Sequence, residues 1–337
     1  MKKRGLIKLA CALAASSIGV KSLLVSAVAQ ESAGVVIGKN GDWLFTPYEY
    51  ANLSDAADTA ASISLLIRAN KAFEAKGIAL LVAIVPSKIR IHQEQLPTNK
   101  RIDAYTNDKY DSIVSRLEAG GVQVANLNKT FLASAHRTSD TPLFLRLDTH
   151  WSQTGAMLAA ETIRAKIEST PQLKTALTAI PAAKFEMAWN EKKTNQRARD
   201  LVRLLPAGAS SFAPEQAMTF KVNRTEAAQT GLLGAGENVG VLAMGSSYTN
   251  KTTGYPDGLR YVLQRELLDI SLPVDFGPWY GMEQYLKDGA FKTSQPRLVI
   301  WEIPEREFRS PPNEKFRDPR YQSDNNAWMD RIIALLK

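Results

Sequence analysis

Two residues able to do acid-base chemistry lie close together in Leu147-Asp148-Thr149-His150-Trp151. Of the three histidines in the chain, His150 is the one that a carboxylate precedes by two residues. In an Asp-x-His loop the carboxylate can accept the imidazole Nδ1 proton, which fixes the tautomer and leaves Nε2 free as a general base. The alternative is that Asp148 or Thr149 caps a helix and His150 lies on the surface. The spacing therefore predicts either two members of a serine-hydrolase triad or an ordinary helix cap.

A candidate nucleophile follows 97 residues after His150, where an apolar stretch runs into Gly245-Ser246-Ser247-Tyr248. A serine beside a glycine at the carboxyl end of a strand has an exposed hydroxyl, and nearby backbone N–H groups can point at an oxyanion. A Gly-Ser-Ser turn alone is usually structural. Combined with the Asp-x-His loop, it completes a set of nucleophile, base and orienting carboxylate.

The composition is that of a globular protein. The chain has 337 residues, of which 45% are hydrophobic and 23% charged, so it can bury a sizeable core in one large domain or two ordinary ones. A disordered or fibrous protein is excluded.

Residues 1–29 have the pattern of a secretory signal. A basic start precedes a short apolar run, and a second apolar stretch ends in Ala27-Val28-Ala29, an A-x-A cleavage pattern before Gln30. Lys21 interrupts the apolar part, so an uncleaved inner-membrane anchor is the alternative, although neither piece reaches the roughly 18–20 residues that span a bilayer. We expect export to the periplasm and one domain over residues 30–337.

The signal also accounts for most of the net charge. It contains five basic residues and no acidic ones, so its removal lowers the net charge from +8 to +3. The remaining chain has no clustered basic face of the kind that binds nucleic acid. The single cysteine, Cys11, lies in the signal, so the mature chain has neither a disulfide nor a thiol nucleophile.

The elements that must position the candidate residues follow an α/β pattern. Near-continuous apolar runs of strand length are typical of a parallel sheet covered on both faces. We expect a hairpin over 38–45, strands over 79–86, 122–127, 239–244 and 296–306, and helices over 54–76, 103–119, 153–168, 257–268 and 330–337. The alternation predicts a sheet flanked by helices.

Three features allow two interpretations each. Lys88 follows the strand over 79–86, where ligands of open α/β sheets gather, but we interpret it as a solvated loop lysine. Residues 171–237 have a weak pattern and form either an insertion or a loose cap over the site. Gly277-Pro278-Trp279-Tyr280-Gly281 is either an aromatic loop lining a sugar-binding cleft or a packed aromatic turn. His136 has no local carboxylate partner and is expected on the surface.

Five blocks, taken together in this order, resemble a known family. They are Gly-x-x-Gly-x-Trp-Leu-Phe from Gly38, Val85-Pro86-Ser87-Lys88, Asp148-Thr149-His150-Trp151, Gly245-Ser246-Ser247-Tyr248 and Trp301-Glu302-Ile303-Pro304-Glu305-Arg306. They look like those of the alginate O-acetylation proteins of the AlgJ and AlgX type. The resemblance covers about residues 38–306, and the Asp-Thr-His-Trp block is its most specific part.

The resemblance implies a fold similar to the SGNH hydrolases, circularly rearranged so that Asp148 and His150 precede the serine. The family's Gly-x-Ser motif implies that Ser247 is the nucleophile and that Ser246 occupies the variable position. The glycine and asparagine that complete the oxyanion hole of ordinary SGNH enzymes are not found in the matched blocks. The candidate substrate-binding residues are Trp151, Tyr248, Trp279, Tyr280 and Arg306.

The resemblance also implies an activity and its partners. We expect an O-acetyltransferase with an acetyl-enzyme intermediate, a polysaccharide acceptor such as alginate, and a membrane-bound O-acyltransferase that delivers acetyl groups, with no metal or organic cofactor. Members of the AlgX kind carry an additional carbohydrate-binding module, and this chain ends about 30 residues after its last matched block, as expected of the single-domain kind. The alternatives are a carbohydrate acetylesterase, or a non-catalytic sugar-binding component of an export complex.

Overall fold

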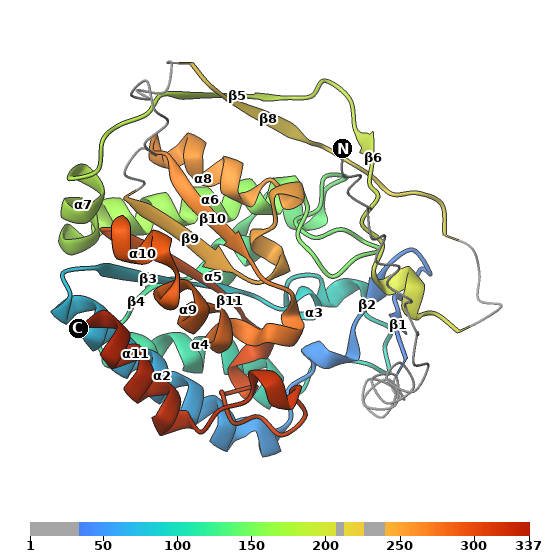
Figure 1. The fold of residues 1–337 in the computed structure, drawn as a ribbon. Helices are drawn as coiled ribbons and strands as arrows, with labels where there is room; N and C mark the ends of the chain where they lie inside the picture. The colour runs from blue at the N-terminus through green and yellow to red at the C-terminus, as the bar shows by residue number, and fades with distance from the viewer. Residues whose placement is uncertain (1–33, 207–211, 226–239) are drawn as a thin grey trace, which may run out of the picture. The chain divides into compact units, whose positions relative to one another are not determined.

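The computed structural model describes residues 34–206, 212–225 and 240–337, and its central element is a five-stranded parallel sheet (Figure 1). The strand order is β10 (Leu267–Ser271), β9 (Val241–Gly245), β11 (Leu298–Pro304), β3 (Ala79–Val85) and β4 (Gln123–Ala125). Parallel strands require crossover connections, and helices supply them on both faces. The predicted α/β class is confirmed. The expected signal, residues 1–29, lies outside the described residues.

The two faces of the sheet belong to two separate cores because successive side chains of a strand point in opposite directions. In β3, Leu80, Val82 and Ile84 join one apolar cluster, whereas Leu81 and Ala83 join the other. Every residue of β3 and β11 is buried. This explains why the sequence shows continuous apolar runs rather than an alternating pattern.

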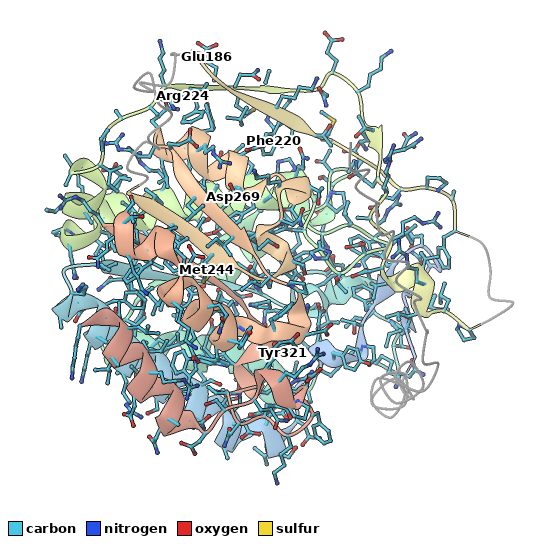
Figure 2. All side chains as sticks on the ribbon, in the orientation of Figure 1. Glu186, Phe220, Arg224, Met244, Asp269 and Tyr321 are labelled. Atoms are coloured by element: carbon cyan, nitrogen blue, oxygen red, sulfur yellow. The ribbon has the colours of Figure 1, made fainter. Side chains whose placement is uncertain are left out.

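Different helices cover each face. The first cluster packs helices α2 (Ala56–Ala75), α4 (Ala104–Ala119), α9 (Gly277–Lys287), α10 (Gly289–Thr293) and α11 (Asn325–Leu336). It also contains Met244 of the central strand β9 (Figure 2). The second cluster packs α5 (Leu127–Ala133), α6 (Gln153–Ser169), α7 (Pro171–Thr178) and α8 (Tyr255–Leu263). No helix of the described residues is both long enough and apolar enough to cross a membrane.

Short elements lie outside the main sheet. The predicted hairpin is present, with β1 (Val36–Ile37) antiparallel to β2 (Leu44–Phe45). A short helix, α3 (Lys88–Ile91), follows β3. The weakly patterned region contains two antiparallel pairs: β5 (Phe185–Trp189) with β8 (Phe220–Arg224), and β6 (Thr194–Asn195) with β7 (Gln216–Ala217).

Two predicted elements are corrected by the structure. The helix expected over 257–268 ends at Leu263, and the residues after it form the edge strand β10. Gln264 terminates this helix in the left-handed conformation, at φ 50°, a position where glycine is the usual residue. The aromatic stretch 277–281 is not a loop, because it forms the first turns of α9 with Pro278 near the helix start.

Candidate active site

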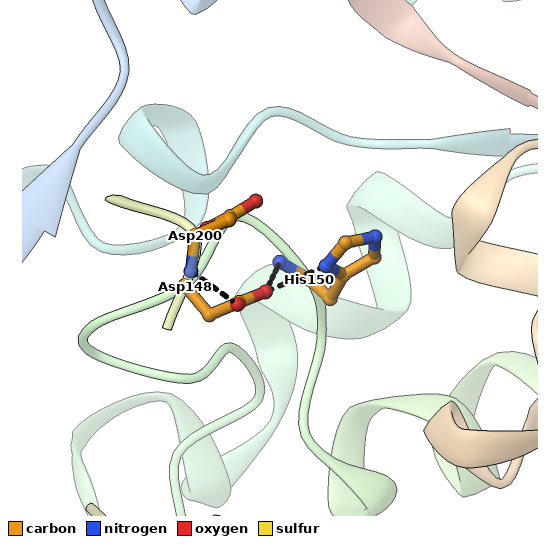
Figure 3. Close-up of side chains that lie close together, drawn as sticks. All are labelled: Asp148, His150 and Asp200. Carbon is orange, nitrogen blue, oxygen red and sulfur yellow. Dashed lines mark hydrogen bonds and ion pairs between the residues drawn. The ribbon is translucent and has the colours of Figure 1, made fainter. Parts of the chain in front are cut away.

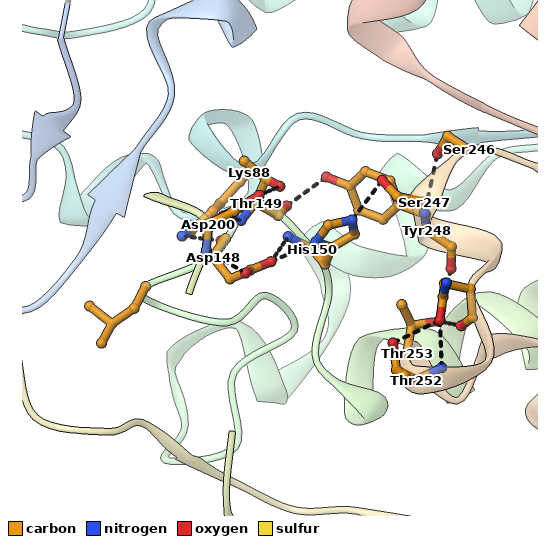
Figure 4. A network of polar contacts seen from close by, with 12 residues as sticks. Lys88, Asp148, Thr149, His150, Asp200, Ser246, Ser247, Tyr248, Thr252 and Thr253 are labelled. Carbon is orange, nitrogen blue, oxygen red and sulfur yellow. Dashed lines mark hydrogen bonds and ion pairs between the residues drawn. The ribbon is translucent and has the colours of Figure 1, made fainter. Parts of the chain in front are cut away.

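The three predicted catalytic side chains meet at the carboxyl end of β9. Ser247 lies in the short 3₁₀ turn Ser247–Thr249 directly after β9, and His150 lies just before α6. The Ser247 Oγ is 2.7 Å from His150 Nε2, and His150 Nδ1 is 2.6 Å from an oxygen of Asp148 (Figure 4). The His150 side chain remains 21% exposed. A hydroxyl, an imidazole and a carboxylate therefore form one continuous relay that solvent-borne molecules can reach.

The Asp148 carboxylate accepts hydrogen bonds at both oxygens. One oxygen accepts hydrogen bonds from the His150 backbone N–H at 3.0 Å and from the His150 ring nitrogen Nδ1. The other accepts from the Asp200 N–H at 2.8 Å (Figure 3). Burial alone would raise the pKa of Asp148, but the hydrogen bond and charge of His150, with the two N–H donors, lower that pKa to about 2. Asp148 is thus an ionised, fixed acceptor for the Nδ1 proton.

We call residues 146–150 the base loop, and two acidic residues from the region between β6 and β7 bind its N–H groups. The Glu215 carboxylate accepts from the N–H of Arg146 at 2.8 Å and from that of Leu147 at 3.2 Å. The Asp200 carboxylate accepts from the Thr149 N–H at 2.8 Å and from the Thr149 hydroxyl. The weakly patterned region, predicted as an insertion or a loose cap, therefore supports the base loop directly.

The carbonyl groups of the base loop are bound by Lys88. Its ammonium donates to the carbonyls of Arg146 and Asp148, each at 3.0 Å, and to that of Leu44 at 2.7 Å. Burial lowers the pKa of Lys88 to about 8, while the nearby carboxylates act in the opposite direction. The expectation of a solvated lysine is wrong, since the side chain is buried and all three of its N–H donors have carbonyl acceptors.

Residues 245–249, the nucleophile turn, depend on a buried carboxylate of the neighbouring strand β11. Glu302 accepts from the Ser246 N–H at 2.7 Å, from the Ser246 hydroxyl at 3.0 Å and from the Thr249 hydroxyl at 3.0 Å. A Cβ on Gly245 would lie 2.2 Å from a Glu302 oxygen, so glycine is required there. Burial raises the pKa of Glu302 to about 7, although these hydrogen bonds oppose the rise.

Two of the predicted substrate-binding residues are buried and contact protein groups instead. Tyr248 donates its hydroxyl to the Thr149 carbonyl at 2.6 Å, and its ring centre lies 4.9 Å from that of His150. Trp151 is buried between Tyr248 and Tyr255, with ring-centre distances of 5.1 and 4.9 Å. Both rings therefore support the base loop from the core side.

The other three candidates lie in different surroundings. The Arg306 guanidinium is mostly buried, 5.8 Å from the Tyr248 ring centre, and faces Glu49 at 3.8 Å. Trp279 is 2% exposed and donates its ring N–H to the Ser310 carbonyl, so it offers no ring face to a sugar. Tyr280 is half-buried and packs against the rings of Phe276 and Tyr321, the second of which is labelled in Figure 2.

Asp200 and Glu215 are the functional residues that the sequence did not reveal. Neither belongs to a motif, and both come from a stretch without clear periodicity. The carboxylates of Asp148 and Asp200 and the His150 ring offer atoms within 4.8 Å of one another, a grouping that can hold a metal ion in principle. In this grouping, however, Asp148 accepts from two backbone N–H groups and the His150 ring, and Asp200 accepts from the N–H and the hydroxyl of Thr149, so hydrogen bonding already accounts for it.

Comparison with known proteins gives consistent matches over this region. The family model described as "SGNH hydrolase-like domain, acetyltransferase AlgX" matches residues 35–305. The probable alginate O-acetylase AlgJ of Pseudomonas aeruginosa is 29% identical over 290 residues, covering 81% of this chain and 70% of the relative. The alginate biosynthesis protein AlgX of Pseudomonas fluorescens is 24% identical over 319 residues, covering 91% of this chain and 60% of that protein.

Solved structures show the same fold. The O-acetyltransferase domain of Pseudomonas putida AlgJ superposes with a TM-score of 0.72 at 22% identity, covering 89% of this chain and 99% of that domain. Pseudomonas aeruginosa AlgX gives a TM-score of 0.64 at 16% identity, covering 88% of this chain and 67% of that one. The family model, matched over residues 35–305, confirms the predicted SGNH hydrolase-like domain, and these structures agree with it in fold.

Proposed function

We propose that this chain, which belongs to the AlgX family of SGNH hydrolase-like acetyltransferases, transfers acetyl groups through Ser247, His150 and Asp148 to hydroxyl groups of a polysaccharide. The observation that carries the proposal is the relay itself. Its two contacts, of 2.6 and 2.7 Å, join a carboxylate, an imidazole and a hydroxyl in the order that acyl transfer requires.

The reaction proceeds in two balanced steps. The Ser247 oxygen attacks the acetyl carbonyl while His150 Nε2 takes the serine proton, and the donor's leaving group departs with that proton. An acetyl ester on Ser247 remains. A sugar hydroxyl then attacks this ester, gives its proton to Nε2, and Ser247 leaves and recovers the proton. Asp148 stabilises the imidazolium in both steps and stays ionised, in keeping with its lowered pKa.

The acceptor we favour is an exopolysaccharide such as alginate. The support comes from the relatives, which include probable alginate O-acetylases and alginate biosynthesis proteins. The acetyl group would come from a membrane-bound O-acyltransferase that passes it across the inner membrane. An oligosaccharide acceptor combined with a simple acetyl ester as donor replaces both partners in an assay.

A carbohydrate acetylesterase is the alternative, because the same relay hydrolyses an ester when water is the acceptor. The two activities are separated by measuring, in one reaction, acetyl groups transferred to an oligosaccharide and acetate released to water. We expect transfer to rise with acceptor concentration at the expense of acetate. Acetate release that is indifferent to every acceptor would make the protein an esterase.

The assignment of the nucleophile is tested with the two adjacent serines. Ser247→Ala should abolish both transfer and hydrolysis, with a loss of up to about 10⁶-fold as seen when a catalytic serine is removed from a triad. Ser246→Ala is the matched control and should retain substantial activity, because Ser246 donates to Glu302 and does not contact His150. An inactive Ser246→Ala beside an active Ser247→Ala would reverse the assignment.

We further propose that the protein works in the periplasm, as a single domain over residues 30–337 released by cleavage before Gln30. The support is the signal pattern in the sequence. Amino-terminal sequencing of the exported protein should give Gln30. Recovery of an intact amino terminus from the membrane fraction would show an anchor instead.

A further inference from the structure

Asp200 occupies an unusual place for a residue without an assigned role, because it binds the triad carboxylate and the residue between the triad members at the same time. Its backbone N–H donates to Asp148, and its carboxylate accepts both the N–H and the hydroxyl of Thr149 (Figures 3 and 4). It lies 52 positions after Asp148 in the chain. A contact of such long range is not a consequence of local folding.

We infer that Asp200 is a positioning residue for acyl transfer, which holds the Asp-Thr-His segment so that His150 keeps the tautomer and the direction that Ser247 requires. This inference rests on the proposed function. Asp200 does not touch Ser247, and it acts through Thr149 and Asp148. The consequence of its loss is a misplaced imidazole rather than a missing proton carrier.

The geometry around Thr149 explains why one side chain has this effect. The Asp200 carboxylate accepts from the N–H and the hydroxyl of Thr149, and the Tyr248 hydroxyl donates to the Thr149 carbonyl at 2.6 Å. Every polar group of Thr149 is therefore bound, and its peptide planes lead directly to Asp148 and His150. Rotation of either plane would move the imidazole, and misplacement by about 1 Å can cost roughly 10²-fold in rate.

The Asp200 carboxylate also lies near a carboxylate of like charge, that of Asp148. Burial, followed by the charge of Asp148, raises the pKa of Asp200. The buried carboxylate of Asp148 and the partly buried one of Asp200 repel each other, so the arrangement is kept for its hydrogen bonds and not for its charge. An asparagine, which is neutral and of the same shape, should therefore replace Asp200 far better than alanine does.

The test compares Asp200→Ala and Asp200→Asn with wild type on a chromogenic acetyl ester. Asp200→Ala removes the two oxygens that accept from the N–H and the hydroxyl of Thr149, but it keeps the backbone N–H that donates to Asp148. We expect its kcat to fall about 10²-fold at nearly unchanged KM. Asp200→Asn keeps an oxygen for the Thr149 N–H and should recover most of the activity. Glu191→Ala, which changes an exposed carboxylate of the same region, is the control and should behave as wild type.

Two further readouts separate positioning from a general structural role. The rate at which a sulfonyl fluoride modifies Ser247 should fall in parallel with kcat, because it depends on the same imidazole. The proton resonance of the His150 Nδ1–H, which arises from a 2.6 Å hydrogen bond, should shift or broaden in Asp200→Ala and return in Asp200→Asn. A purely structural residue would change the melting temperature and leave both readouts intact.

A folded Asp200→Ala with wild-type kcat and wild-type sulfonylation overturns the inference, while an inactive Ser247→Ala in the same assay leaves the proposed function standing. An active Ser247→Ala would overturn the proposed function itself. If Asp200→Ala does not fold, Thr149→Val decides, with Thr149→Ser as its control. Reduced kcat in the valine variant alone supports the inference, and wild-type kcat in both contradicts it.

Discussion

The base loop and the nucleophile turn meet across two hydrogen bonds, between Ser247 and His150 and between Tyr248 and Thr149, yet the chain builds them in different ways. The nucleophile turn follows a central strand and is held by Glu302, a residue of the adjacent strand of the same sheet. The base loop follows no strand of the central sheet, and the isolated bridge between Phe144 and Trp151 closes it. Its polar groups are bound by Lys88, Asp200 and Glu215, which come from three separate places in the chain.

This difference indicates how substitutions should affect the nucleophile turn and the base loop. A turn supported by a sheet keeps its shape as long as the sheet is folded, so changes at Glu302 should act mainly through ionisation. A loop supported by distant side chains loses its shape when one of them is removed, since buried polar groups without partners are costly.

The largest effect is expected inside the base loop, at Asp148. Asp148→Asn keeps the shape of the side chain but presents an amide to Nδ1 and favours the wrong tautomer, which costs about 10⁴-fold in turnover in a related triad. The variant should fold with a melting temperature close to that of wild type. If Asp148 were only a helix cap, asparagine would serve almost equally well and activity would be near normal. Initial rates on an acetyl ester, measured together with melting curves, distinguish the two.

The next effect concerns the support of the base loop by Lys88. Lys88→Met removes the donor to three carbonyls, of which that of Arg146 still accepts the Leu44 N–H. Since each of the other two, left unpaired, costs about 1–3 kcal/mol, we expect a loss of about 2 kcal/mol or more in the free energy of unfolding. Activity should fall as well. Lys71→Met, at an exposed position of α2, is the control and should change stability by less than about 0.5 kcal/mol. Equal stability of the two variants would refute the role assigned to Lys88.

The smallest effect is expected at the nucleophile turn, and it depends on pH. Burial raises the pKa of Glu302 from 4.5 to about 7, so the folded state binds this proton more tightly than the unfolded state. The corresponding stabilisation is complete below about pH 4.5 and is lost as the pH rises through about 7. Glu302→Gln cannot titrate, so its stability should decline less than that of wild type between pH 5 and 8.

Activity of Glu302→Gln should change little, because a glutamine oxygen can still accept the Ser246 N–H. Glu161→Gln, at an exposed position of α6, is the matched control and should follow the wild-type curve. Denaturant unfolding at several pH values provides the measurement. Parallel curves for Glu302→Gln and wild type would contradict the assigned pKa shift.

The difference between support from a neighbouring strand and support from distant residues also explains which parts of the molecule the sequence predicts. The apolar runs predicted four of the five central strands, and the Asp-x-His and Gly-Ser-Ser patterns brought the relay residues to attention because their signals are local. Strand β10 was missed because Gln264, and not glycine, ends the preceding helix. Trp279 was misplaced because an aromatic-rich stretch does not show whether it faces solvent or core, although Pro278 favours a helix start.

The sequence did not predict the residues that support the base loop, for a different reason. Lysine is a residue type that usually lies on the surface. Lys88 is buried because three carbonyls from other segments of the chain accept hydrogen bonds from its ammonium group. Asp200 and Glu215 act across 52 and 69 positions of the chain, from a region without periodicity. Contacts of this kind depend on tertiary structure and leave no spacing in the sequence.

Trapping the acetyl-enzyme intermediate shows whether Ser247 carries the acetyl group during the reaction. The protein is mixed with an excess of a reactive acetyl ester, quenched in acid at times shorter than one turnover, digested and analysed by mass spectrometry. We predict an added acetyl group on Ser247 that disappears when an oligosaccharide acceptor is supplied, and that does not form in Ser247→Ala. Acetylation of Ser246 instead, or turnover without any acetylated peptide containing Ser247, would contradict the account.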